Sequence, residues 1–230
     1  MDRGFVGSVF LNYLTIQSPN DLTISFGKIH LDKENVFSII KDMKIILASS
    51  SARRKEFFSQ LGIDGRIIPS DVEEVVLDTP EETAVYNAVK KVRWVGEKED
   101  NIKGYIIVGF DTLVFHEGQI LGKPKNKEDS VRMLKRLSGK WHSVFTGVAL
   151  FKDGVVFQDY DVSNVKFHKL NDSQILYYVD SGQSLDKAGS YGIQDKNMSF
   201  IDRIEGSFSN VVGFPLRTTR NILNEVGFKI

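Results

Sequence analysis

The sequence contains no cysteine, which excludes a disulfide scaffold, a zinc-thiolate site and a cysteine nucleophile together. It also lacks an excess of either charge. Thirty lysines and arginines balance thirty aspartates and glutamates, so no overall field draws the chain to nucleic acid or to an anionic membrane. No apolar run approaches the roughly 18 residues of a membrane span, and the N-terminus lacks the small-residue cleavage site of a secretory signal. We therefore expect a cytoplasmic protein without nucleic-acid or membrane partners.

What the chain does have is enough apolar material for a sizeable core, because 41% of its 230 residues are hydrophobic. From Met43 onward predicted strands and helices alternate, which favours an α/β domain over residues 43–230 with helices packed on a sheet. Residues 1–42 have weak, mixed periodicity and resemble an N-terminal extension, whose order the sequence does not decide. The sequence also leaves open whether this extension is native or whether Met43 is the natural start.

The most informative segment spans residues 43–62 and reads MKIILASSSARRKEFFSQLG. A short apolar run predicts a buried strand, and an amphipathic helical pattern ends at Gly62. Between them, free backbone N–H groups at the helix start would attract anions, helped by three serine hydroxyls. The guanidinium groups of Arg53 and Arg54 can grip phosphate oxygens bidentately. The segment is therefore either a phosphate site or an ordinary serine cap followed by two solvated arginines.

The rest of the chain predicts further elements in turn. Thr79 and Pro80 suit the start of a helix that runs to about Gly96, and Asp153-Gly154 predicts a hairpin turn between two strands. The other expected elements are a strand leading into an acidic loop over 65–76, a long strand over 105–115, a helix over 130–137, a short helix near 174–181, a strand over 199–206 and a last helix over 215–225.

Asp111 interrupts the long apolar strand, where an isolated buried carboxylate would cost several kcal/mol, so it should have a partner. It is either a metal ligand or general base for water at a strand end, or a cap of a turn at Gly109-Phe110. An acidic cluster lies earlier in the chain, at Asp71, Glu73 and Glu74. This cluster is a solvated charge run unless it lies near Asp111. Magnesium is usually held by one or two carboxylates plus substrate phosphates, so one Glu and one Asp suffice.

Two lysines and one loop are candidates for binding a nucleotide. Lys123 lies between Gly122 and Pro124, a rigid context that fixes its ammonium. Lys91 is a weaker candidate, because a lysine on an amphipathic helix is most often solvated. The loop over 186–194 combines glycines that allow close backbone approach with the amide of Gln194, which could read a base edge. The histidines lack ligand spacing and are expected to be structural or on the surface: His30, His116, His142 and His168.

Several segments, taken in order over residues 43 to about 216, closely resemble the Maf family of nucleoside triphosphate pyrophosphatases. They are LASSSARRKEFFSQLGI, DVEE, GFDTLVFHEGQILGKP, MLKRLSGKWHSVFTGVAL, LDKAGSYGIQ and FIDRIEGSFSNVVGFPL. The resemblance implies an α/β fold with a mixed twisted sheet, flanking helices and a central cleft, similar to inosine triphosphate pyrophosphatase-like (Maf/Ham1) folds. It also implies hydrolysis of a nucleoside triphosphate to monophosphate and diphosphate, with a divalent metal cation (Mg or Mn) as cofactor.

The resemblance carries roles onto individual positions. The serine-rich loop of the family falls on Ser49 and Ser51, its second loop arginine on Arg54 and its helix lysine on Lys91, all of them substrate-binding. The acidic residue of the family falls on Glu74, which the resemblance makes a metal ligand.

The same resemblance places the catalytic aspartate, described as the proton acceptor and a second metal ligand, on Asp111, and a substrate-binding lysine on Lys123. One branch of the family prefers dTTP and UTP, and it resembles this chain at three specificity positions, which are Arg54, Thr112 and Gln194. Ala52 stands where the family usually has proline, which should loosen the turn without removing a ligand.

The resemblance favours a house-cleaning dTTP/UTP pyrophosphatase, with CTP and modified pyrimidine nucleotides as further candidate substrates and a homodimer as a plausible assembly. Three alternatives stay open. One is a pyrophosphatase of the 7-methyl-GTP branch, and another is a purine-specific enzyme. Because the family was named for an effect on septum formation, the third is a nucleotide-sensing regulator of cell division that acts by binding.

Overall fold

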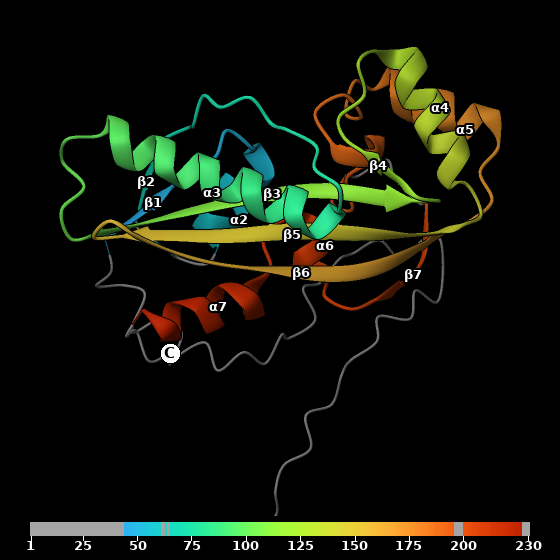
Figure 1. Ribbon diagram of the computed structural model, residues 1–230. Coiled ribbons are helices and arrows are strands. Elements are labelled where there is room, and N and C mark those ends of the chain that lie inside the picture. The colour runs from blue at the N-terminus through green and yellow to red at the C-terminus, as the bar shows by residue number, and fades with distance from the viewer. Residues whose placement is uncertain (1–43, 61–62, 64, 196–199, 227–230) are drawn as a thin grey trace, which may run out of the picture.

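The computed structural model of this chain describes residues 44–60, 63, 65–195 and 200–226. The predicted extension over 1–42, together with Met43 and Gly62, lies outside the described residues. Within them, seven strands form one mixed sheet in the order β2, β1, β3, β5, β6, β7, and β4 also pairs with β3 (Figure 1). Strand β1 runs parallel to β2 and β3, and the other pairs are antiparallel. The predicted class, a mixed α/β sheet with flanking helices, is confirmed.

The elements have the following bounds. The strands are β1 (Lys44–Leu47), β2 (Gly65–Ile67), β3 (Tyr105–His116), β4 (Gln119–Leu121), β5 (Trp141–Lys152), β6 (Val155–Phe167) and β7 (Ile201–Glu205). The helices are α2 (Ala52–Gln60), α3 (Pro80–Lys98), α4 (Lys127–Leu137), α5 (Asp172–Asp180), α6 (Phe208–Val212) and α7 (Leu216–Glu225), with a short 3-10 turn, η1 (Ala188–Ser190).

Local capping explains where most of the helices begin. The Thr79 side chain accepts the N–H of Glu82 at 3.2 Å and so starts α3 where the sequence predicts it. Helix α4 begins three residues earlier than predicted, because Asn126 accepts the N–H of Asp129 at 2.8 Å and caps it. Helix α6 was not predicted, since its five residues are too few to show a helical period.

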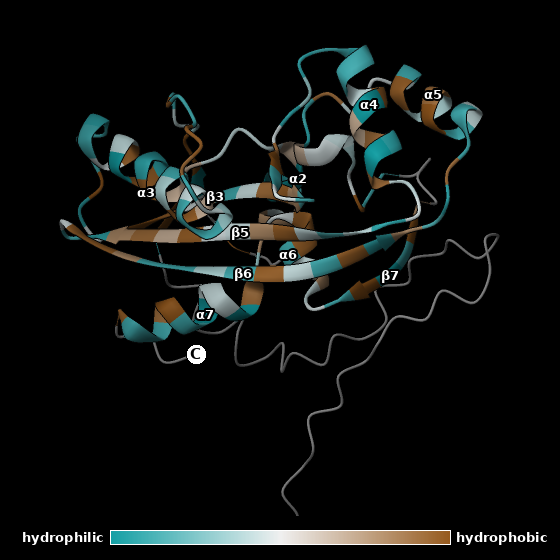
Figure 2. Cartoon of the chain, turned by 45° about the vertical axis from the view of Figure 1, so that its right-hand side comes forward, coloured by the Kyte–Doolittle hydropathy of each residue, from teal (hydrophilic) through white to brown (hydrophobic). Residues whose placement is uncertain are grey.

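Helices cover both faces of the sheet. Helix α3 packs on β3 and β5 on one face, while α6 and α7 pack on β5 and β6 on the other (Figure 1). Helices α4 and α5 pack together beside the end of β3 that pairs with β4. Hydrophobic residues run along β3 and β5, and the outer sides of α3 and α4 are hydrophilic (Figure 2). Among the described residues, no helix has the length and apolar character needed to span a bilayer.

Strand β3 presents its side chains alternately to the two faces. Ile106, Val108 and Phe110 join a hydrophobic cluster with residues of α2, α6 and α7. Ile107 faces the other way and packs against α3, so Asp111, four residues further along, shares that face. The side chain directly opposite Asp111 on β5 would be that of residue 147, which is glycine. A Cβ there would lie 2.2 Å from the Ala84 carbonyl oxygen, so the glycine lets α3 lie directly on the sheet.

One edge of β3 has a gap in its strand pairing. Strand β5 pairs with residues 107–115 along one side. On the other side, β1 pairs with residues 105–108 and β4 with residues 114–116, so within the described part of the chain residues 109–113 have no strand partner on that edge. The gap lies where β1 ends. In open α/β sheets ligands bind just outside the carboxyl ends of strands, so we expect the functional site to lie at this gap.

Candidate active site

Asp111 lies in the middle of β3, beside this gap. It is 6% exposed, and both of its carboxylate oxygens have partners on α3. Lys91 donates from Nζ to Oδ1 at 2.5 Å, and Asn87 donates from Nδ2 to Oδ2 at 3.2 Å. The alternative in which Asp111 caps a turn is wrong, as is the expectation of a strand end, because the strand continues for five more residues to His116. The predicted partner exists, and it is a lysine ammonium.

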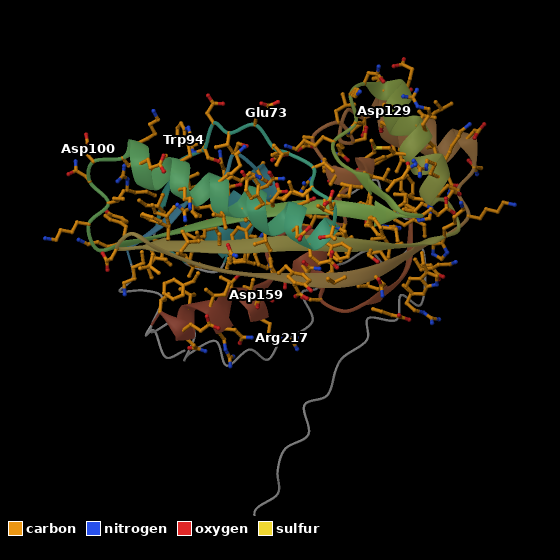
Figure 3. The ribbon with its side chains drawn as sticks, viewed as in Figure 1. Glu73, Trp94, Asp100, Asp129, Asp159 and Arg217 are labelled. Atoms are coloured by element: carbon orange, nitrogen blue, oxygen red, sulfur yellow. The ribbon has the colours of Figure 1, made fainter. Side chains whose placement is uncertain are left out.

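Lys91 joins Asp111 to the acidic loop. Its ammonium also donates to Glu74 Oε1 at 2.7 Å and to the Phe110 carbonyl at 3.4 Å. Lys91 is buried, so the interpretation of it as a solvated helix lysine is wrong. Glu74 is therefore near Asp111, as the functional hypothesis for the acidic cluster requires. The neighbouring Glu73 is exposed on the outer side of the loop (Figure 3).

Burial and nearby charges shift the pKa values of Asp111 and Glu74 in opposite directions. Burial raises the pKa of the Asp111 carboxyl; the nearby Glu74 charge adds to the rise, and Lys91 only partly opposes it. Burial also works to raise the pKa of Glu74, but the charges of Lys91 and Lys123 outweigh it and leave that pKa below its ordinary value. The pKa values of these two neighbouring carboxyl groups are thus shifted in opposite directions.

The donor set suits a divalent cation held partly by its substrate. Among the described residues, no group of three or more His, Asp or Glu side chains forms an all-protein metal cage. Glu74 and Asp111 nevertheless converge on a single ammonium, so a positive charge already lies between them. Hard oxygen ligands of this kind, one Glu and one Asp, fit Mg²⁺ or Mn²⁺ completed by phosphate oxygens and water.

The serine-rich loop connects β1 to α2 as the sequence predicts. Ser49 is buried, and its Oγ accepts the N–H of Ser51 at 3.2 Å, which folds the loop back at the end of β1. The loop brings backbone N–H groups and hydroxyls to the carboxyl end of β1, next to the gap in the pairing of β3. This arrangement is typical of an anion site.

The two adjacent arginines differ in their surroundings. Arg54 donates from Nε to the Gly213 carbonyl and from Nη2 to Thr112 Oγ1, both at 2.8 Å, and its guanidinium lies 5.7 Å from the centre of the Phe110 ring. Arg54 is therefore not a free surface charge. Burial lowers its pKa to about 10, with Asp111 acting in the opposite direction, so it stays charged at neutral pH.

Arg53 has a donor to spare. Its Nη1 is buried, and within the described ranges it has no hydrogen-bond partner. A buried guanidinium N–H without a partner is costly and points to a group that the protein binds. The family resemblance assigns a role only to Arg54. The sequence signal that could have identified Arg53 is the arginine pair itself, which marked both residues as candidate phosphate ligands.

Two of the three predicted specificity residues, Arg54 and Thr112, lie in one polar network. Thr112 follows Asp111 in β3 and therefore points to the opposite face, toward Arg54. Its hydroxyl is 3.0 Å from that of Thr146, which donates to the Asn210 carbonyl at 3.2 Å. The Oε1 of Gln194 is buried and has no hydrogen-bond partner among the described residues, so this amide also has spare capacity.

The loop that carries Gln194 is held by a buried polar cluster. Tyr178 donates its hydroxyl proton to Asp195 and accepts the N–H of Gly192 at 3.2 Å. Lys187 is buried and lies 3.6 Å from the same Asp195 carboxylate. These contacts on both sides of Gln194 fix the loop, which the sequence identified only by its glycines and amide.

The remaining residues named in the sequence analysis are Lys123 and the histidines. Lys123 follows β4, is well exposed, and lies 4.0 Å from Glu74 Oε1, so its ammonium faces the acidic loop. His116 and His142 are buried, and His142 Nε2 lies 2.7 Å from the Tyr191 hydroxyl. His168 is exposed. The positions of these three agree with the predicted structural or surface placement, and His30 lies outside the described residues.

The fold and this site together define an α/β protein with a charged site at the carboxyl end of its first strand. The chain belongs to the Maf family, because the family model described as Maf-like protein matches residues 44–226.

Curated relatives match over most of the chain. One from Thermotoga maritima, named dTTP/UTP pyrophosphatase, is 45% identical over 186 residues, covering 81% of this chain and 91% of its own. Relatives of the same name from Acetivibrio thermocellus and Aquifex aeolicus are 41% and 42% identical; they cover 82% and 80% of this chain and 98% and 96% of their own.

Solved structures give a looser likeness. The Ham1 protein of Staphylococcus aureus overlaps with a TM-score of 0.39 at 15% identity, over 54% of this chain and 71% of that chain.

Proposed function

We propose that this chain hydrolyses dTTP and UTP to the nucleoside monophosphate and diphosphate. The observation that carries the proposal is the single ammonium of Lys91 shared by Glu74 and Asp111, beside a serine-rich loop at the carboxyl end of β1. The names of the curated relatives support the substrate class. The proposal includes a house-cleaning role in the cytoplasm.

The mechanism assigns a role to each charged group. Asp111, with its raised pKa, accepts a proton from the water that attacks the α-phosphorus, and diphosphate leaves. A divalent cation, when bound, would be held by Glu74 and Asp111 and would supply charge neutralisation on the triphosphate. Lys91 holds the two carboxylates at their positions, while the exposed ammonium of Lys123 offsets charge on the phosphates.

The guanidinium groups and the amide select and hold the nucleotide. The serine-rich loop, with Ser49 and Ser51, offers hydroxyls and backbone N–H groups to phosphate oxygens. The spare donor of Arg53 adds a charge-assisted hydrogen bond. Gln194, Thr112 and Arg54 form the proposed specificity set, in which Gln194 has the unsatisfied atom that a pyrimidine edge could pair with.

A nucleotide panel tests the proposal directly. Diphosphate release is measured from dTTP, UTP, CTP, GTP and 7-methyl-GTP with Mg²⁺ or Mn²⁺. Turnover is expected with dTTP and UTP. Preference for GTP or 7-methyl-GTP would instead support a purine-specific enzyme or the other branch of the family. Binding without release from any nucleotide would support the nucleotide-sensing regulator and reject the enzyme.

Substitution of Asp111 by asparagine tests the catalytic assignment. Asp111→Asn keeps the shape of the side chain but cannot accept a proton as a carboxylate does, so kcat is expected to fall by roughly 10²–10⁴-fold. Binding of a non-hydrolysable α,β-imido-dUTP, measured by calorimetry, should be largely retained. Asp159→Asn is the matched control, because Asp159 is an exposed aspartate on β6 (Figure 3). Near-normal diphosphate release by Asp111→Asn would reject the assignment.

A further inference from the structure

Asn87 is a buried residue on α3, one turn before Lys91, and its side-chain amide contacts both the acidic loop and Asp111. Its side chain makes three hydrogen bonds. Oδ1 accepts the N–H of Val75 at 3.0 Å, while Nδ2 donates to the Val75 carbonyl at 2.9 Å and to Asp111 Oδ2 at 3.2 Å. Asn87 is 2% exposed, so solvent does not compete for these bonds.

The contacts with Val75 fix which way the amide of Asn87 points. A backbone N–H can only donate and a backbone carbonyl can only accept, so the oxygen of the amide must face the Val75 N–H and the nitrogen must face the carbonyl. An inverted amide would lose both bonds and would set its oxygen against the Asp111 carboxylate. The second N–H of the amide is therefore directed at Asp111 Oδ2 by the backbone of the loop.

We infer that Asn87 is a positioning residue whose single side chain aligns both the general base, Asp111, and the acidic loop. It clamps the backbone of Val75, the residue directly after Glu74, and it directs one N–H at the carboxylate of Asp111. Lys91 occupies the other oxygen of Asp111, so the two α3 side chains together fix the plane of the carboxylate. The inference rests on the proposed function of the site.

The sequence around Asn87 explains how one amide reaches both elements. Residues 87 and 91 are four apart on a helix and so lie on the same face. That face meets the sheet at Gly109 and Gly147, where a Cβ would overlap the helix. Because α3 lies so close to the sheet, an asparagine side chain is long enough to contact both Asp111 and the acidic loop. An apolar side chain at this position would leave the Val75 N–H and carbonyl without these hydrogen bonds.

The test compares Asn87→Leu with a matched control. Leucine has a similar shape but removes all three hydrogen bonds, and kcat is expected to fall roughly 10–100-fold, the usual effect of losing a group that orients a ligand residue. KM for dTTP should change by less than about threefold, because Asn87 is expected to orient the general base more than to hold substrate. Asn87→Ser, which is smaller and polar, repeats the measurement if the leucine variant fails to fold.

Thr83→Val is the matched control. Thr83 lies one turn earlier on α3, is equally buried, and ties the same loop to the helix, because its Oγ1 accepts the N–H of Leu77 at 3.0 Å. Within the described part of the chain, its hydroxyl bonds to Leu77 and to the Thr79 carbonyl and not to Asp111. A general loosening of the loop would therefore lower kcat in both variants, whereas the positioning role lowers it in Asn87→Leu alone.

Two further readouts separate positioning from loss of folded protein. The stoichiometry of α,β-imido-dUTP binding should stay near that of wild type, and hydrogen exchange of the segment around Val75 should become faster in Asn87→Leu. The inference is overturned by wild-type kcat, by a fall in kcat matched by an equal fall in binding stoichiometry, or by an equal fall in Thr83→Val. Failure of the proposed function would appear separately, as wild-type protein that releases no diphosphate, and would overturn the positioning role with it.

Discussion

Substitution of Gly147 by alanine is the sharpest test of how the fold places the site. The added Cβ would lie 2.2 Å from the Ala84 carbonyl oxygen and 2.3 Å from the carbon of that group, whereas ordinary contacts begin near 3.4 Å. Backbone atoms of a helix cannot rotate aside as a side chain can, so α3 must move away from β5 by about 1 Å to restore packing. Overpacking of this kind costs about 1–3 kcal/mol of folding free energy.

The same displacement acts on catalysis, because α3 carries Lys91 and Asn87. The contact between Lys91 and Asp111 is 2.5 Å long, and an added separation of this size would lengthen it to about 3.5 Å and weaken it. A misplacement of about 1 Å typically costs about 10²-fold in rate, so kcat for dTTP is expected to fall by that order. Urea unfolding measures the loss of stability, and diphosphate release at saturating dTTP measures kcat.

Gly96→Ala is the matched control for Gly147→Ala. It crowds the same helix against the same strand, but its Cβ would meet the ring of Phe151 at 2.7 Å, and a partly exposed ring can turn away. We expect Gly96→Ala to lower the free energy of unfolding while keeping the wild-type kcat. If Gly147→Ala kept wild-type stability, or lost stability while keeping wild-type kcat, the reasoning that links the close approach of α3 to catalysis would be refuted.

Two further substitutions test the buried histidine and the spare donor. Burial lowers the pKa of His142 to about 3, from an ordinary 6.5, so the unfolded chain takes up a proton that the folded chain refuses, and stability falls as pH drops from 6.5 toward 3. The loss reaches about 2 kcal/mol at pH 5, and His142→Gln should remove this part of the pH dependence of urea unfolding whereas exposed His168→Gln keeps it. Arg53→Lys should raise KM for dTTP roughly tenfold, the value of one charge-assisted hydrogen bond, with little change in kcat. An unchanged KM, or an equal rise in the exposed Arg132→Lys, would contradict that role for Arg53.

The sequence predicts those features that depend on nearby residues. The Thr79 cap followed by Pro80 placed the start of α3, and Asp153-Gly154 marked the turn between β5 and β6, where both residues have a positive φ. The apolar run around Asp111 indicated a buried carboxylate that needed a partner, which the structure supplies as Lys91. Family resemblance added the grouping of the site residues, which periodicity alone does not give.

Features that depend on contacts between residues far apart along the chain could not be predicted from the sequence. Arg53 and Arg54 are adjacent and chemically identical, and what separates them is that Arg54 meets the Gly213 carbonyl, 159 positions away. Asn87 had no distinguishing pattern, because its partners, Val75 and Asp111, lie 12 and 24 positions away in opposite directions along the chain. Such roles arise when tertiary packing brings segments together, so they became visible only in the folded chain.

The contact of Arg54 with Gly213 has a consequence for how the protein can evolve. Gly213 ends α6 with φ near +93°, and a Cβ there would lie 2.8 Å from Thr112 Oγ1 and 3.4 Å from Arg54 Nη2. Replacing Arg54 alone would leave a carbonyl and a hydroxyl without their donor, and replacing Gly213 alone would push against both side chains. Under the specificity role proposed for Arg54 and Thr112, a new nucleotide preference should therefore arise by paired changes, with single intermediates less fit than either end point.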